Sequence, residues 1–115
     1  MADSLALVKG TLDLLVLKAL SWEPMHGFEV TAWLEQHSGG ALDVDDSALY
    51  QALYRMEAAG LIAAEWGVTE NNRRARYYHI TRGGRAHLRR ETSFWLRYAS
   101  TVTAILSLAP TTARA

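Results

Sequence analysis

Apolar residues recur every seven positions over the last third of the chain, and no other feature constrains the fold as strongly. The two heptad series are Leu88, Trp95, Val102 and Ala109, with Tyr98 and Ile105 between them. This spacing predicts an amphipathic helix over residues 82–109, about 42 Å long at the usual rise per residue. A single core made by 115 residues covers only part of such a helix, so we expect its apolar stripe to contact a second copy of the chain. The alternative is that this helix folds back on the first helix alone.

A second helical pattern, over residues 5–20, has two apolar faces. Leu12 and Leu15 belong to one face, whereas Leu14 and Leu17 belong to the other. A helix with two apolar faces needs two neighbours, and we expect one of them in a second subunit. The sequence therefore predicts a homodimer. Its predicted interface residues are Leu12, Leu15, Trp95, Tyr98, Val102 and Ile105.

The composition is that of an ordinary globular domain. Half of the residues are hydrophobic, and twelve basic residues balance twelve acidic ones. No apolar run reaches about 18 residues, so we expect no membrane-spanning helix. The N-terminus lacks the features of a secretory signal, which favours a cytoplasmic protein. Because the chain has no cysteine, disulfides, thiolate metal sites and cysteine nucleophiles are excluded.

The charges are segregated along the chain. Residues 1–67 carry three basic and ten acidic side chains, whereas residues 68–90 carry seven arginines and a single glutamate. Arginine without lysine favours planar, bidentate recognition of phosphate. The alternative is a solvated, charged helix face.

A third helix is predicted over about 46–59, between the cap residues Asp45, Asp46 and Ser47 and the helix stop at Gly60. It follows a second helix that runs from Phe28 to the breaker at residues 38–40. One face of the third helix is apolar, with Leu49, Ala52, Leu53 and Met56. The opposite face carries hydrogen-bonding groups and no acid: Ser47, Tyr50, Gln51, Tyr54 and Arg55.

Two short strands, over 61–68 and 76–80, are predicted to form a hairpin with a turn at Asn71 and Asn72. Arg73, Arg74 and Arg76 flank this turn, so the hairpin is expected to present cations at its end. Thr81 is the predicted N-cap of the last helix.

Three helices, a hairpin and a further helix give an α+β, mostly α, fold with the layout of a winged helix-turn-helix, in which the third helix enters the DNA major groove. Gln51 is the best candidate for reading a base, since its amide can pair with adenine. Ser47 is a candidate for base contact or capping, Tyr50 and Tyr54 for phosphate contact, and Arg55 for either. Arg73, Arg74 and Arg76 are expected to contact phosphate. The predicted domains are a DNA-binding domain over 1–81, a dimerisation helix over 82–109 and a disordered tail over 110–115.

Three segments resemble PadR-like transcriptional regulators. The first comprises residues 9–17 and 25–30, the second residues 47–62, and the third residues 73–81, which is similar to the family's wing with its paired tyrosines. The resemblance implies a bacterial repressor that binds a palindromic operator as a dimer and is often released by a small molecule. The single C-terminal helix is similar to that of the short subfamily. Gln51 and Tyr54 replace a proline and a histidine common in relatives, and Ala75 interrupts the basic cluster, so the family's base preference is not carried over.

Rival interpretations concern ligands and partners. Trp95 and Tyr98 are candidates for an aromatic or phenolic effector site, or simply for interface core. His87 and Glu91, four residues apart, are a weak zinc signal, and we expect neither a metal nor another cofactor. The sequence has no phosphate-binding loop, nucleophile elbow or recognisable carboxylate pair, so we expect that the protein is not an enzyme. The main alternative function is a winged-helix module that binds a protein and not double-stranded DNA.

Overall fold

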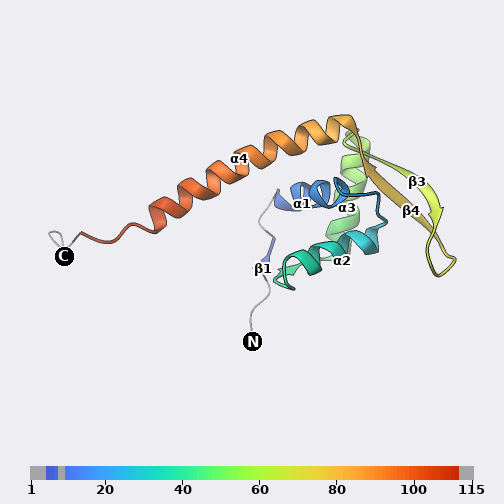
Figure 1. The fold of residues 1–115 in the computed structure, drawn as a ribbon, viewed down its shortest axis with the longest axis horizontal. Helices are drawn as coiled ribbons and strands as arrows, with labels where there is room; N and C mark the ends of the chain where they lie inside the picture. Colours follow the sequence, from blue (N-terminus) through green and yellow to red (C-terminus); the bar gives the residue numbers. More distant parts are fainter. Residues whose placement is uncertain (1–4, 8–9, 112–115) are drawn as a thin grey trace.

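The computed structural model describes residues 5–7 and 10–111, and Figure 1 shows the order of the elements along the chain. Three helices form the body: α1 (Thr11–Leu20), α2 (Gly27–His37) and α3 (Asp46–Ala58). An antiparallel hairpin follows, made of β3 (Ile62–Val68) and β4 (Arg74–Ile80), and α4 (Arg82–Leu106) ends the described fold. Two short strands, β1 (Leu5–Ala6) and β2 (Leu42–Asp43), pair in parallel. The predicted α+β, mostly α, class is confirmed.

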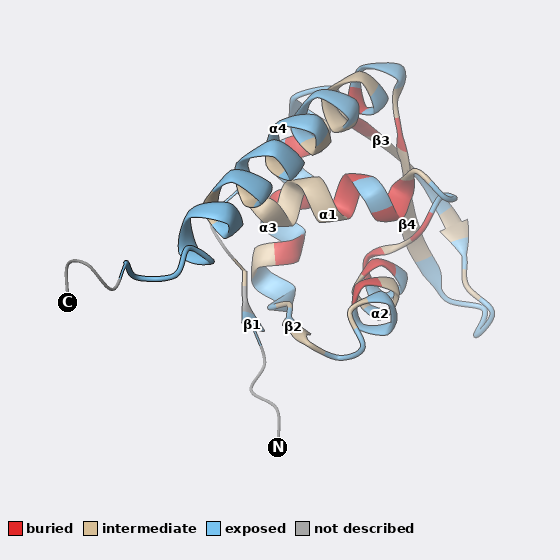
Figure 2. Cartoon of the chain, turned by 60° about the vertical axis from the view of Figure 1, so that its left-hand side comes forward, coloured by how far each residue is buried: buried red, intermediate tan, exposed pale blue. Residues whose placement is uncertain are grey.

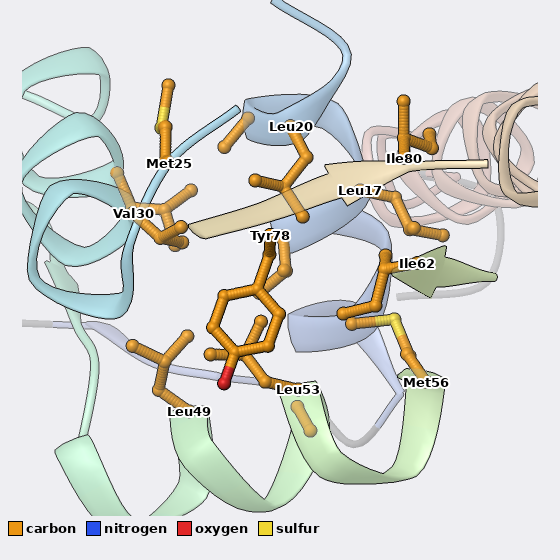
Figure 3. Close-up of a cluster of buried hydrophobic side chains, with 14 residues drawn as sticks. Leu17, Leu20, Met25, Val30, Leu49, Leu53, Met56, Ile62, Tyr78 and Ile80 are labelled. Carbon is orange, nitrogen blue, oxygen red and sulfur yellow. The ribbon is translucent and has the colours of Figure 1, made fainter. Parts of the chain in front are cut away.

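The core lies where α1, α2, α3 and the base of the hairpin meet (Figure 3). The four residues predicted as the apolar face of the third helix are all buried: Leu49, Ala52, Leu53 and Met56. The Tyr78 ring points from β4 toward Leu49 and Leu53, and Ile62 and Ile80 close the core at the hairpin base. Burial of this stripe fixes which face of α3 remains outside.

The first helix is shorter than predicted. The apolar pattern over residues 5–20 predicts one helix, but α1 begins at Thr11 because Gly10 has a φ of 89°, in the left-handed region. Leu5 donates a backbone hydrogen bond to the Ala41 carbonyl (2.6 Å), so this segment pairs with β2 and does not continue the helix. Residues 8 and 9 of the predicted helix lie outside the described residues.

Capping fixes the start of the two middle helices. The His26 Nδ1 accepts from the Glu29 amide, while the Glu29 carboxylate accepts from the His26 amide, which is a capping box at the start of α2. Asp45 Oδ2 accepts from the Ala48 amide (3.0 Å) and caps α3. The cap is therefore Asp45, and the side chain of Ser47 has no capping role.

The hairpin pairs Ile62 with Ile80 at its base and Val68 with Arg74 near its tip. Asn72 in the turn has a φ of 60°, which agrees with the turn predicted at the two asparagines. Thr81 caps α4: its hydroxyl accepts from the Gly84 amide (3.0 Å) and lies 2.7 Å from the Gly60 carbonyl oxygen. The predicted cap at Thr81 is confirmed.

Helix α4 extends well beyond the body of the molecule, and its outer turns are mostly exposed (Figures 1 and 2). It ends at Leu106 and not near Ala109, and the next residue, Ser107, is the C-cap, whose backbone amide donates to the Thr103 carbonyl oxygen. Residues 112–115 of the predicted tail lie outside the described residues. Among the described residues, no helix is both long and apolar enough to cross a membrane.

Candidate nucleic-acid interface

The outer face of α3 presents all five residues that the sequence predicts for DNA contact. Ser47, Gln51 and Arg55 are exposed, as are the phenol side chains of Tyr50 and Tyr54, which are 52% and 79% accessible. Together with Ala58 these five residues line a shallow hollow of about 590 Å³. Large aromatic side chains on an exposed helix lose the benefit of burial, so their presence here indicates a surface that another molecule covers.

Arg55 has a partner that the sequence does not reveal. Its Nη2 donates to Asp13 Oδ1 on α1 over 2.5 Å, across 42 positions of sequence. Both side chains are solvent-accessible, so this ion pair contributes little to stability. It neutralises Arg55, which is the only Lys or Arg side chain of α3.

The tip of the hairpin carries Arg73 and Arg74, both exposed as predicted. The Thr69 amide donates to the Arg73 carbonyl oxygen (2.8 Å), and the Thr69 hydroxyl accepts from the Arg73 amide (3.2 Å). The tip is therefore a defined turn, and the cations that it carries project from the body of the protein with it.

Arg76 lies in a different place from the other two hairpin arginines. The sequence predicts Arg76 at the projecting end of the hairpin. In the structure, the Arg76 Nη2 instead donates to Glu57 Oε2 on α3 (2.8 Å). The Arg76 Nε is buried and has no hydrogen-bond partner among the described residues. The guanidinium also lies 5.8 Å from the centre of the Tyr78 ring. Burial raises the pKa of the Tyr78 hydroxyl, and the nearby Arg76 charge partly opposes this shift. The Arg76 guanidinium links the hairpin to the end of α3.

Between the hairpin and the start of α2 lies an open cavity of about 820 Å³. It brings Tyr50 of α3 together with Trp66, Arg74 and Arg76 of the hairpin and with Phe28 of α2. Trp66 and Phe28 are not among the residues predicted for this surface, although Phe28 is 77% exposed at the second position of its helix. Trp66 pairs with Arg76 in the strand register, and alternation along β4 places Arg74 on the same face. The alternation within each strand is a signal in the sequence, whereas the register that joins the two strands comes from the structure.

A second cleft, of about 400 Å³, separates the start of α1 from α4. Trp95 and Tyr98 line it together with Phe94, whose ring stacks on Tyr98 with centroids 5.9 Å apart. Asp13, His87 and Glu91 lie along the same cleft. The described residues contain no group of three metal-ligating side chains, so the pairing of His87 with Glu91 gains no third ligand there.

The residues predicted for the dimer interface divide into two groups. Leu12, Leu15 and Trp95 are half-buried within the chain, and the two leucines pack against the core. Val102 is half-buried, whereas Tyr98 and Ile105 are exposed, as are Phe94, Leu96 and Leu106 along the same helix. The outer half of α4 thus carries a large apolar surface that the described part of the chain leaves mostly exposed.

Comparison with known proteins gives concordant matches. Residues 16–90 match the family described as "Transcriptional regulator PadR-like family". A PadR-like transcriptional regulator of Bacillus cereus is 28% identical, with a TM-score of 0.76 over 88% of this chain and 96% of that one. A PadR family transcriptional regulator of Eggerthella lenta is 30% identical, with a TM-score of 0.75 over 88% of this chain and 86% of that one.

A curated relative comes from Streptomyces fradiae and is described as an uncharacterized 37.1 kDa protein in a transposon. It is 37% identical over 90 residues, which are 78% of this chain but only 24% of that protein. The chain therefore spans about a quarter of this relative.

Proposed function

Because the chain belongs to the PadR-like family of transcriptional regulators, we propose that it is a homodimeric repressor that binds a palindromic operator in double-stranded DNA. In this proposal α3 is the recognition helix and enters the major groove, while the hairpin is the wing and contacts the phosphate backbone. The observation that carries it is the outer face of α3, where Ser47, Tyr50, Gln51, Tyr54 and Arg55 are all exposed and none is acidic.

The roles within this surface follow from side-chain chemistry. Gln51 reads a base edge through its amide, and Ser47, freed from capping by Asp45, lies one turn earlier on the same face. Tyr50 and Tyr54 donate to phosphate oxygens. Arg73 and Arg74 supply wing charge, whereas Arg76 holds the wing to α3 through Glu57 and contributes less to DNA affinity.

Dimerisation through α4 supports a two-fold symmetric operator. The DNA-binding unit of each chain (residues 1–81) leads into this dimerisation helix, whose outer apolar stripe is mostly exposed to solvent among the described residues. A small aromatic or phenolic effector is expected at Trp95 and Tyr98, where the cleft between α1 and α4 offers aromatic rings. No catalytic step is part of this function, and a regulator of this kind acts in the cytoplasm.

The test is a titration of the purified protein with duplex DNA from upstream of its own coding region, at two salt concentrations, with an unrelated duplex as the reference. We expect binding to the upstream duplex to survive the higher salt, and binding to the unrelated duplex to disappear. Equal, strongly salt-sensitive binding to both duplexes would contradict sequence-specific regulation. Absence of binding at low salt would favour the protein-binding module.

A paired variant distinguishes DNA binding from general charge. Replacing Arg73 and Arg74 together by alanine is expected to weaken binding to every sequence and to reduce the salt dependence. Replacing Arg89 and Arg90, which are exposed on α4, removes the same charge away from the wing. Equal losses of affinity from the two double variants would show that net charge, and not the wing, governs binding.

A further inference from the structure

Trp66 lies on the wing, is 61% exposed and stands directly opposite Arg76 in the strand register. An exposed tryptophan on a two-stranded hairpin buries little apolar surface, so its contribution to folding does not explain its position. The ring instead contacts cations. The guanidinium of Arg74 lies 4.5 Å from the ring centroid, and that of Arg76 lies 5.9 Å from it.

The two guanidinium groups beside this ring differ in their charge balance. Arg76 donates to the Glu57 carboxylate at 2.8 Å, so its charge is compensated within the protein. Arg74 has no carboxylate partner among the residues that the structure describes. Of the two, Arg74 is therefore the one whose charge remains for an anion outside the protein, and it is also the one nearer to the Trp66 ring.

The ring also restricts where Arg74 points. An exposed arginine has many rotamers, and fixing it against a phosphate costs conformational entropy at the time of binding. A cation resting on an indole face has already given up part of that freedom, and its N–H groups at the ring edge remain accessible. Arg74 and Trp66 line the same open cavity as Tyr50 of the recognition helix.

We propose that Trp66 is a positioning residue for DNA binding, which holds the Arg74 guanidinium at the cavity shared with Tyr50 so that it can bind a backbone phosphate. This inference rests on the proposed function. Trp66 acts through Arg74 and does not bind DNA itself, so its effect depends on the presence of the arginine side chain.

The experiment compares Trp66→Leu, which keeps apolar bulk but removes the ring, with Trp66→Phe, which keeps a ring. Each is made in the unmodified chain and in an Arg74→Ala chain, and binding to the upstream duplex is measured over a range of salt. We expect Trp66→Leu to weaken binding about two- to fivefold for each wing, and Trp66→Phe to remain within about twofold of the unmodified chain.

In the Arg74→Ala chain the same Trp66→Leu change is expected to weaken binding no further. Arg74→Ala itself should reduce the slope of log affinity against log salt by about 0.9 for each phosphate that the protein no longer neutralises. Val68→Ala, on the same face and exposed, is the control for truncating this strand, and we expect it to leave affinity and slope unchanged.

Equal losses of affinity from Trp66→Leu in both backgrounds would overturn the inference, because Trp66 would then act without Arg74. A Trp66→Phe variant as weak as Trp66→Leu would also overturn it. If the unmodified chain binds no DNA, the proposed function fails and this inference fails with it. If the unmodified chain binds its upstream duplex and the effects of the two substitutions add, only the inference fails.

Discussion

Asp13 on α1 accepts a hydrogen bond from Arg55 on α3, with Oδ1 2.5 Å from Nη2. If α3 binds DNA as proposed, Asp13 competes with a phosphate for this guanidinium, and it lowers the positive charge of the outer face of α3. We predict that Asp13→Asn strengthens binding to upstream and unrelated DNA alike by about two- to fivefold at low salt, with a smaller effect at high salt. Fluorescence anisotropy titrations at two salt concentrations measure this change.

Asp43→Asn is the matched control, because Asp43 is exposed on β2 and its replacement alters the net charge equally. Thermal unfolding should change little for either variant, since an exposed ion pair contributes at most about 1 kcal/mol to stability. Weaker DNA binding by Asp13→Asn would mean that Asp13 orients Arg55 toward the DNA and does not compete for it.

Two adjacent glycines at the start of α4 provide a second prediction. A Cβ at Gly84 would overlap with the Leu61 carbonyl oxygen and lie 2.8 Å from Ile80 Cγ1, whereas a Cβ at Gly83 would meet nothing nearer than 3.8 Å. We predict that Gly84→Ala lowers the free energy of unfolding by about 1–3 kcal/mol or more. Gly83→Ala should raise it by up to about 1 kcal/mol, because alanine favours helix.

Urea denaturation at one fixed protein concentration measures both changes. Equal effects of the two substitutions would show that the close approach of α4 to the Leu61 backbone is not a constraint on the fold.

The sequence is sufficient to predict helix α3, because one amphipathic pattern and its cap signals lie close together around a helix of thirteen residues. The apolar stripe that includes Leu53 and Met56 is buried, and the opposite stripe with Gln51 and Tyr54 is exposed. Turn chemistry also identifies the hairpin. Local signals of this kind depend only on residues that are close in sequence, so one sequence is enough to detect them.

Contacts between residues that lie far apart in the sequence could not be predicted from it. Nothing in the pattern around Asp13 indicates Arg55, and nothing around Glu57 indicates Arg76, because each pair forms only when two elements pack together. The predicted start of the first helix is wrong for a related reason. A continuous apolar pattern extends the helix through Gly10, whereas the backbone there turns and residues 5–6 pair with β2.

Tyr78 gives a prediction about alkaline pH. Burial raises the pKa of its hydroxyl, with Arg76 as an opposing influence, so the folded protein favours the neutral phenol more than the unfolded chain does. The resulting stability is fully present below the ordinary tyrosine pKa of about 10 and is lost as the pH rises through the pKa of the folded state. We predict that Tyr78→Phe loses less stability than the unmodified chain above about pH 10, in parallel denaturation series that start near neutral pH. Parallel pH profiles for the two proteins would contradict this.

The outer half of α4 leads to the last prediction. Half-buried Val102 and exposed Ile105 lie on the apolar stripe of this helix, and a carboxylate at either position would be buried without a partner in a dimer. We predict that Val102→Asp combined with Ile105→Asp raises the dimer dissociation constant about a hundredfold or more, measured by sedimentation velocity. Ser100→Asp combined with Ala104→Asp adds the same charge to the opposite, exposed face of the helix and should leave the dimer intact.

The same variants separate dimerisation from DNA contact. A monomer retains the recognition helix and the wing but engages only one half-site, so the Val102 and Ile105 double variant should lose most of its affinity for a two-fold symmetric operator while keeping its weaker binding to unrelated DNA. If both double variants sediment as the unmodified chain does, the apolar stripe of α4 is not the dimer interface. If the unmodified chain is itself a monomer at micromolar concentration, recognition of a palindromic operator by a preformed dimer is excluded.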